Sequence, residues 1–403
     1  MNINIPKEVD KALNILHGNG FEAYIVGGCV RDSILGLHPS DWDITTSAKP
    51  NEISRCFRGY RTIETGIKHG TLTIIVDKMQ IEITTYRIDG EYSDHRRPDK
   101  VSFTDNIKLD LMRRDFTINA LAYNKNEIID LFGGIDDIRN KIVKCVGNPD
   151  ERFNEDGLRI LRALRFASVL NFDIEKNTSE SIHRNKNLLN NISGERINTE
   201  FNKLLMGSNF RKIIVDYRNI IEIFIPNLNT LSCEEMECRL NAMKELNSII
   251  LRLTLLLYKA EAPNKILMSL KYDNKTIDTV KLLSSGIDEK IYSEPVNIKR
   301  WLYKINYENL YNLIKIKKAL FKSECKDLIN SEKIMNEIIE TNQCYSLKTL
   351  EIGGQDLIAA GIPEGENIGR ILNKILDDVI EGKLKNERNV LLNYINENKI
   401  IIN

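Results

Sequence analysis

The sequence predicts an α+β protein in which a small N-terminal head, with a mixed β-sheet and helices, is followed by an elongated all-α region. Two observations support this class. Short β-like runs alternate with helical stretches in the first part of the chain. From about Asn106 onward, helical periodicities replace the β-branched runs to the end of the chain. The length of 403 residues exceeds one ordinary core, so several structural units are expected.

The elements of the head follow one another closely. The chain begins with an amphipathic helical segment, and residues 50–56 form a second helical stretch. The β-like runs occupy residues 23–27, 42–46, 70–77 and 80–87. Residues 88–105 are polar and too long for a tight hairpin, so they are expected to form a mobile loop or a passive surface loop.

Composition limits the function classes. The 57 basic and 57 acidic residues cancel, so any binding of nucleic acid must depend on local clusters of charge. The N-terminus lacks the basic and apolar regions of a signal peptide, and the longest apolar stretch, residues 249–258, is far shorter than the roughly 20 residues of a membrane span. We therefore expect a cytoplasmic protein with no membrane contact. The seven cysteines and five histidines show no zinc-binding spacing.

A pair of glycines follows the first β-like run. Gly27 and Gly28 precede a predicted helix, and Arg31 lies within its first turn. Glycines allow a phosphate to approach the backbone, the helix N-terminus offers free N–H groups, and arginine supplies a planar cation. The alternative interpretation is a simple turn, which is the usual role of such glycines.

Two carboxylates flank Trp42. Asp41 and Asp43 are spaced by two on a predicted strand, so both side chains are expected on the same face, about 7 Å apart. Acidic groups this close repel each other unless a cation lies between them, and Mg²⁺ held by carboxylates and substrate phosphates is typical of phosphoryl transfer. The alternative is a solvated face of an edge strand.

A third carboxylate lies on a later strand. Glu82 stands between Ile81 and Ile83, so it is expected to face away from these apolar neighbours. If its strand lies beside that of Asp41 and Asp43, Glu82 can polarise an attacking hydroxyl or hold a second ion. An ordinary exposed strand glutamate is the alternative.

Residues 113–120, RRDFTINA, concentrate charge at the start of a helical region. The arginines Arg113 and Arg114 suit a triphosphate, and Asp115 suits a ribose hydroxyl. The alternative is a helix start with an acid near its positive end.

The segment 151–167, ERFNEDGLRILRALRFA, carries Asp156 and three arginines spaced by three residues: Arg159, Arg162 and Arg165. These form a drifting stripe on one helical face, which alone would indicate a solvated amphipathic helix. Cytosine and adenine both present an amino donor beside a ring-nitrogen acceptor, so a fixed acid and arginine, Asp156 and Arg159, can pair with either base. Guanine and uracil would leave buried groups unpaired, at about 1–3 kcal/mol each.

Taken in order, GGCVRD, DWDITT, IEITTYR, RRDFTINA, DLFGGIDDI and EDGLRILRALRF resemble the signature series of the class II CCA-adding enzymes and related bacterial poly(A) polymerases. The C-terminal segment resembles the tail of the short Gram-positive type. The resemblance implies that Asp41 and Asp43 bind the metal ions, with Glu82 as a supporting carboxylate. It also implies a set of nucleotide-binding residues, consisting of Gly28, Arg31, Arg113, Asp156, Arg159, Arg162 and Arg165, to which the residue chemistry adds Asp115.

The resemblance implies four domains: a nucleotidyltransferase head (1–138), a base-recognising helical neck (139–205), a helical body (206–320) and a tRNA-binding helical tail (321–403). The implied reaction is template-independent addition of CCA to tRNA lacking its 3′ CCA end, from CTP and ATP, by a two-metal mechanism with Mg²⁺. No protein partner is predicted. An A-adding enzyme, a poly(A) polymerase and a catalytically idle tRNA-binding protein are the alternatives.

Overall fold

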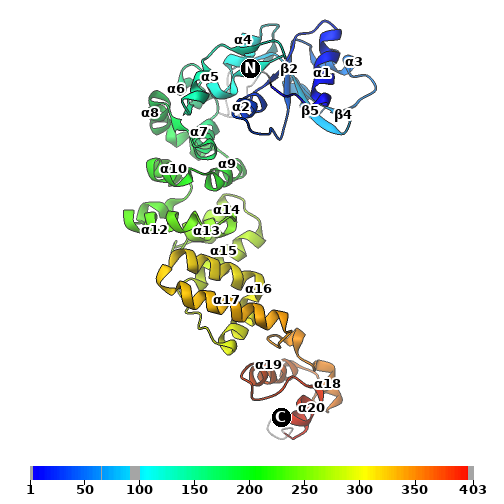
Figure 1. Ribbon diagram of the computed structural model, residues 1–403, viewed down its shortest axis with the longest axis vertical. Coiled ribbons are helices and arrows are strands. Elements are labelled where there is room, and N and C mark those ends of the chain that lie inside the picture. The colour runs from blue at the N-terminus through cyan, green and yellow to red at the C-terminus, as the bar shows by residue number, and fades with distance from the viewer. Residues whose placement is uncertain (1–2, 65, 91–99, 398–403) are drawn as a thin grey trace. The chain divides into compact units, whose positions relative to one another are not determined.

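The computed structural model describes residues 3–64, 66–90 and 100–397. The chain forms two compact units. The first comprises residues 1–229 together with 269–271, and the second comprises residues 230–268 and 272–403 (Figure 1). The finer division into head, neck, body and tail stays a prediction.

The head is built on a seven-stranded sheet in the order β3-β4-β5-β2-β1-β8-β9. Strand β2 pairs in parallel with β5, and the other pairs of this sheet are antiparallel, which confirms the predicted mixed sheet. The bounds in chain order are β1 (Ala23–Val26), β2 (Asp43–Thr46), β3 (Arg61–Ile63), β4 (Thr71–Val76), β5 (Met79–Thr85), β8 (Leu121–Tyr123) and β9 (Ile128–Asp130).

Helices accompany the sheet and continue beyond it in the first unit. Around the sheet lie α1 (Lys7–Gly18), α2 (Gly28–Ile34), α3 (Pro50–Cys56), α4 (Ile107–Met112) and α5 (Gly134–Arg139). The following helices are α6 (Pro149–Glu155), α7 (Leu158–Leu170), α8 (Lys176–Asn185), α9 (Gly194–Met206), α10 (Phe210–Asp216) and α11 (Arg218–Ile221). Short 3₁₀ turns occupy Ile67–His69, Thr117–Asn119, Lys186–Asn191 and Pro226–Thr230.

The expectation of helices alone beyond Asn106 is wrong. Strands β8 and β9 complete the sheet, and two further strands, β10 (Ile142–Val143) and β11 (Asp173–Ile174), pair in parallel. Each of these strands has only two or three residues, which is too short to show a period of two in the sequence.

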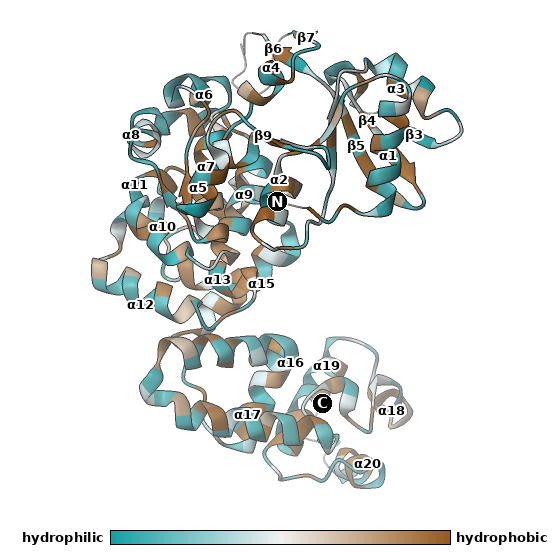
Figure 2. Ribbon diagram, turned by 45° about the horizontal axis from the view of Figure 1, so that its top comes forward, coloured by the Kyte–Doolittle hydropathy of each residue, from teal (hydrophilic) through white to brown (hydrophobic). Residues whose placement is uncertain are grey.

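Along the central strands, successive side chains point to opposite faces of the sheet, and this alternation determines which of them face the site. Along β5, Ile81 and Ile83 are fully buried, whereas Glu82 between them is exposed, as predicted. The apolar stripe of α1 (Val9, Leu13 and Leu16) is buried, and α1 and α3 both contact β4. Figure 2 shows hydrophobic residues along β4 and β5 beside these helices.

The polar segment after β5 begins and ends as a small ribbon. Strands β6 (Arg87–Asp89) and β7 (Val101–Phe103) pair antiparallel, and the Gly90 N–H donates to the Lys100 carbonyl at 2.9 Å. The middle of the expected mobile loop, residues 91–99, lies outside the described residues.

The second unit is helical throughout its described residues. Its helices are α12 (Cys233–Met243), α13 (Ile249–Leu256), α14 (Pro263–Ser269, which ends in the first unit), α15 (Asn274–Gly286), α16 (Pro295–Leu320), α17 (Cys325–Glu340), α18 (Gly354–Ala359), α19 (Glu366–Ile380) and α20 (Arg388–Glu397), with 3₁₀ turns at Lys322–Glu324 and Leu347–Thr349. A separate apolar core joins α18, α19 and α20 through residues such as Leu357, Ile375 and Leu391. Within the described ranges, no helix has both the length and the apolar character that crossing a membrane requires.

Candidate active site

Two acidic side chains meet at the centre of the head sheet. The register of the parallel pair sets Asp43 of β2 directly opposite Glu82 of β5. The strand of Glu82 therefore lies beside the strand of Asp43, as a role for Glu82 in the site requires. Burial raises the pKa of Asp43 to about 6, the charges of Glu82 and Asp41 raise it as well, and Arg114 opposes them. A carboxylate held in this way is poised to be neutralised by a cation.

Asp41 reaches this cluster from a different position than predicted. Strand β2 begins at Asp43, so Asp41 belongs to the connecting segment before the strand and not to the strand itself. Its side chain is exposed and accepts a hydrogen bond from Ser40 Oγ at 2.9 Å. The prediction that Asp41 and Asp43 lie on one face of a strand is therefore wrong for Asp41, which is positioned by the bend that follows α2.

The turn between β1 and α2 depends on glycine. Gly27 has φ of 83°, a conformation that L side chains rarely adopt, and a Cβ there would lie 3.1 Å from Arg114 Nη1. Gly28 is the first residue of α2. Arg31 is 8% exposed, and its guanidinium donates to Asp32 at 2.8 Å and to Asn119 Oδ1 at 2.5 Å. The structure thus places Arg31 next to the glycine turn but already paired.

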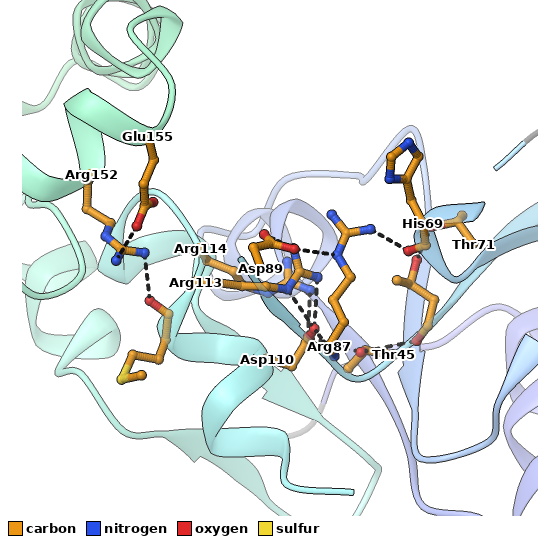
Figure 3. A network of polar contacts seen from close by, with 12 residues as sticks. Thr45, His69, Thr71, Arg87, Asp89, Asp110, Arg113, Arg114, Arg152 and Glu155 are labelled. Carbon is orange, nitrogen blue, oxygen red and sulfur yellow. Dashed lines mark hydrogen bonds and ion pairs between the residues drawn. The ribbon is translucent and has the colours of Figure 1, made fainter. Parts of the chain in front are cut away.

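Three consecutive residues, Arg113, Arg114 and Asp115, point to three different parts of the site; we call them the RRD segment. Arg113 donates to Asp110 at 2.8 Å and lies 3.5 Å from Asp89 of the β6–β7 ribbon (Figure 3). Arg114 also reaches Asp110, at 3.4 Å, and acts electrostatically on Asp43.

Asp110 is the hub of this network. It is fully buried and accepts bonds from Thr45 Oγ1 of β2 at 3.1 Å and from the backbone N–H of Arg87 at 3.3 Å. Burial opposes its ionisation, but Arg113 and Arg114 hold the pKa of Asp110 below its ordinary value. Figure 3 shows Thr45, Arg87, Asp110 and both arginines converging. The hub ties the ribbon to the strand that carries Asp43.

Asp115, the third residue of the segment, connects to helix α7. Its Oδ2 accepts two bonds from Arg162, at 2.8 and 2.5 Å, and its Oδ1 accepts from Asn119 at 3.1 Å. Burial opposes ionisation, yet Arg162 and these hydrogen bonds hold the pKa of Asp115 well below its usual range. Asp115 is therefore an ionised anchor that joins the sheet to α7.

Asp156 and Arg159 lie at the start of α7. Asp156 accepts from the Leu158 N–H at 3.1 Å and from Arg196 of α9 at 2.7 Å. Arg159 is 9% exposed and donates to Glu155 at 2.5 Å and to the Arg113 carbonyl at 3.2 Å. Each side chain is thus fixed by neighbours, and Arg159 is tied directly to the RRD segment.

Arg165 completes the stripe. It donates to Glu200 of α9 at 2.8 Å, and its guanidinium carbon lies 3.6 Å from the centroid of the Phe166 ring. Hydrogen bonds link Arg31 of α2 through Asn119 to Asp115, Asp115 to Arg162 of α7, and Arg165 of α7 to Glu200 of α9, so four of the predicted residues belong to one network.

Comparison with known proteins follows this geometry. Three family profiles match successive parts of the chain: "Poly A polymerase head domain" at residues 23–144, "Probable RNA and SrmB- binding site of polymerase A" at 171–230, and "tRNA nucleotidyltransferase domain 2 putative" at 243–395. The CCA-adding enzyme of Ligilactobacillus salivarius (strain UCC118) is 37% identical over 401 residues, which covers 96% of both chains. The chain belongs to the CCA-adding enzyme family.

Other relatives agree with this membership in the CCA-adding enzyme family. The CCA-adding enzyme of Enterococcus faecalis (strain ATCC 700802 / V583) is 35% identical over 399 residues, covering 96% of this chain and 95% of that one. A solved structure, the Bacillus stearothermophilus CCA-adding enzyme in complex with CTP, matches with a TM-score of 0.82 and 28% identity over 98% of both chains. The predicted resemblance and fold class are confirmed.

Nucleotidyltransferases of this family generally need divalent metal ions. Among residues 3–64, 66–90 and 100–397, no group of three or more His, Cys, Asp or Glu side chains is arranged to hold a metal ion. Mg²⁺ usually binds one or two carboxylates and takes its other ligands from substrate phosphates and water. The exposed Asp41 and the half-buried Asp43 supply that kind of donor set.

Sequence reasoning missed the supporting residues of this CCA-adding enzyme family member. Asp110, Arg196 and Glu200 position the predicted residues, and none of the three was a predicted site residue. A signal existed for Asp110, because it precedes Arg113 and Arg114 at the i, i+3 and i, i+4 spacings of a helix. Arg196 and Glu200 share one face of α9, but their partners, Asp156 at the end of α6 and Arg165 of α7, are 40 and 35 residues away in the sequence.

Proposed function

We propose that this chain adds C, C and A to the 3′ end of tRNA that lacks its CCA end, without a nucleic-acid template, using CTP and ATP. The observation that carries the proposal is the register of the parallel strands, which sets Glu82 opposite Asp43, beside Asp41 and next to the glycine turn before α2. Carboxylates beside a phosphate-binding turn are what nucleotidyl transfer requires.

In the reaction, the 3′ hydroxyl of tRNA attacks the α-phosphorus of the nucleotide. A bond forms between that oxygen and phosphorus, the bond to the bridging oxygen of the β-phosphate breaks, and pyrophosphate leaves. Asp41 and Asp43 would hold Mg²⁺, two ions in the mechanism that we favour, which supply Lewis-acid stabilisation of the phosphoryl oxygens and of the attacking oxygen when bound. Glu82 would support this site as a third carboxylate.

The other residues of the site would bind and orient the nucleotide. Gly27 and Gly28 leave room for the triphosphate at the turn, and Arg31, Arg113 and Arg114 provide positive charge around it. Asp115 would accept a bond from a ribose hydroxyl in place of Arg162, which donates to it in this structure.

Base selection would rest on Asp156 and Arg159. Their carboxylate and guanidinium present an acceptor and a donor that fit the pairing edges of cytosine and adenine, and not those of guanine or uracil. Arg196, Glu155 and the Arg113 carbonyl hold the two side chains in place, which supports a fixed reader. Residues 1–138 would act as the nucleotidyltransferase head, 139–205 as the base-recognising neck, 206–320 as the body and 321–403 as the tRNA-binding tail. A cytoplasmic location remains the expectation.

A nucleotide-resolved extension assay tests the proposal. Purified protein is incubated with tRNA that ends at the position before CCA, with CTP, ATP or both, and with or without Mg²⁺. Two C residues are expected with CTP alone, a full CCA end with both nucleotides, and no product without the ion. Growth of long A tails, or incorporation of A alone, would replace the proposal with a poly(A) polymerase or an A-adding enzyme.

A further inference from the structure

An aromatic side chain lies at the centre of the arginine cluster. Phe166 of α7 is 5% exposed and packs edge-to-face against Phe116, with ring centroids 5.7 Å apart at 78°. Three guanidinium groups surround its ring, with the carbon atoms of Arg165, Arg31 and Arg162 at 3.6, 5.0 and 5.5 Å from the centroid. The ring therefore meets cations from two helices, α2 and α7.

The three arginines are also linked by polar contacts. Asn119 bridges Arg31 to Asp115, and Asp115 in turn holds Arg162. Glu200 binds Arg165 at 2.8 Å and lies 3.7 Å from Arg162. These contacts occupy N–H donors of the guanidinium groups, which are the groups that a nucleotide would need.

The aromatic contact is different in kind. A cation is attracted to the face of a phenyl ring by the ring quadrupole, and this attraction leaves the N–H donors in the guanidinium plane free. When a nucleotide takes those donors, the polar links among the arginines must loosen, but the contacts with Phe166 can remain. A phenylalanine also has no polar atom that would compete with the nucleotide for hydrogen bonds.

We propose that Phe166 is a positioning residue that holds Arg31, Arg162 and Arg165 in a fixed arrangement while their donors bind the nucleotide. This inference rests on the proposed function. It assigns Phe166 a role that links the phosphate-binding end of α2 to the base-reading helix α7. Loss of the ring should then weaken nucleotide binding, and should leave unchanged both tRNA binding and the choice of base, which rests on Asp156 and Arg159.

The test compares Phe166→Leu with Phe166→Tyr in the full-length protein. The leucine variant keeps an apolar side chain but lacks the ring, whereas the tyrosine variant keeps the ring face. For Phe166→Leu we expect the Kd for CTP, measured by calorimetry with Mg²⁺, and the KM for CTP to rise roughly tenfold. The preference for CTP over UTP and the KM for tRNA should both stay within about twofold of wild type. Phe166→Tyr should restore both nucleotide constants.

Phe57→Leu is the matched control. Phe57 is also buried, at 1% exposure, and packs edge-to-face on Tyr60 with centroids 5.7 Å apart at 76°. It lies just after α3, outside the proposed site. Its replacement should lower the melting temperature to a similar extent without changing the Kd or the KM for CTP.

Two results would overturn the inference. One is an unchanged Kd for CTP in Phe166→Leu, and the other is an equal change in the KM for CTP and for tRNA. If the leucine variant does not fold, Phe166→Met, which fills the volume without a ring, replaces it in the same comparison. The wild-type extension assay distinguishes the proposed function from the role of Phe166. If the wild-type protein adds CCA and Phe166→Leu binds CTP normally, only the role of Phe166 is refuted.

Discussion

At the scale of single residues, the site depends on charges that other charges hold in place. Asp43, Asp110 and Asp115 are all removed from solvent to a large degree, but their environments differ. Arginines compensate Asp110 and Asp115, whereas Asp43 faces Glu82 and Asp41. The first two therefore stabilise the fold, and Asp43 carries repulsion that a bound cation would relieve.

The substitution Asp115→Asn should show how much the Asp115 carboxylate contributes to folding stability, and how that contribution depends on pH. The folded-state pKa of Asp115 lies below the unfolded value of about 3.9, so its stabilising contribution is complete above that value and is lost as the pH falls toward the folded pKa. We expect the variant to be about 2–3 kcal/mol less stable at pH 7, because Arg162 loses its partner. In urea denaturation, the difference from wild type should narrow below about pH 4. A gap that stays constant from pH 7 to pH 3 would contradict this account.

At the scale of elements, the short connections carry the chemistry. The turn from β1 into α2, the RRD segment after α4 and the junction of α6 with α7 place several predicted nucleotide contacts at or near the end of an element, whereas Arg162 and Arg165 lie inside α7. The sequence predicted β1, β2, β4, β5 and α3 to within about one or two residues because their patterns are long enough to read. It missed β8 and β9 because three-residue strands show no periodicity.

The glycine turn gives a prediction with a matched neighbour. Gly27→Ala should destabilise the first unit by about 1–3 kcal/mol, because alanine is strained at φ of 83° and its Cβ would press on Arg114 Nη1. Gly28→Ala should cost little stability, since Gly28 is helical and its Cβ would meet Arg31 at an ordinary 3.5 Å. Chemical denaturation of both variants measures the difference. Equal stability of the two would show that the positive φ of Gly27 is not needed.

At the scale of the whole molecule, contacts between segments far apart in the sequence are the features that could not be predicted from the sequence. Residues 269–271, which are the last residue of α14 and the two after it, belong to the first unit, where the Leu270 carbonyl accepts a bond from Asn198 at 3.0 Å. A Cβ on Gly194 would lie 2.0 Å from the Ser269 carbonyl oxygen, so this glycine permits the close approach. The predicted roles of Asp156 and Arg159 came from chemistry within one helix, but the partner of Asp156 on α9 is 40 residues away.

Metal binding should be visible in the stability of the whole protein. A ligand that binds only the folded state raises its melting temperature by mass action, so millimolar Mg²⁺ should raise the Tm of wild type. Asp43→Asn removes one charge from the repelling cluster. It should therefore raise the Tm of metal-free protein by a few degrees, abolish the response to Mg²⁺ and abolish nucleotide addition.

Asp136→Asn serves as the control for this experiment. The Asp136 side chain is 74% exposed and pairs with Arg139 on the surface, away from the acidic cluster. Its response to Mg²⁺ should equal that of wild type. A full Mg²⁺ response in Asp43→Asn would remove Asp43 from the metal site.

The RRD segment has a consequence for how the chain tolerates change. Arg113 lies 3.5 Å from Asp89 of the β6–β7 ribbon, Arg114 acts electrostatically on Asp43, and Asp115 accepts hydrogen bonds from Arg162 of α7, so each position has its own role. A point substitution here disturbs one role and leaves two. Insertion or deletion of a single residue before Arg113 would instead shift all three side chains by one position, so that all three contacts would be lost together. This segment should therefore tolerate substitutions better than insertions or deletions.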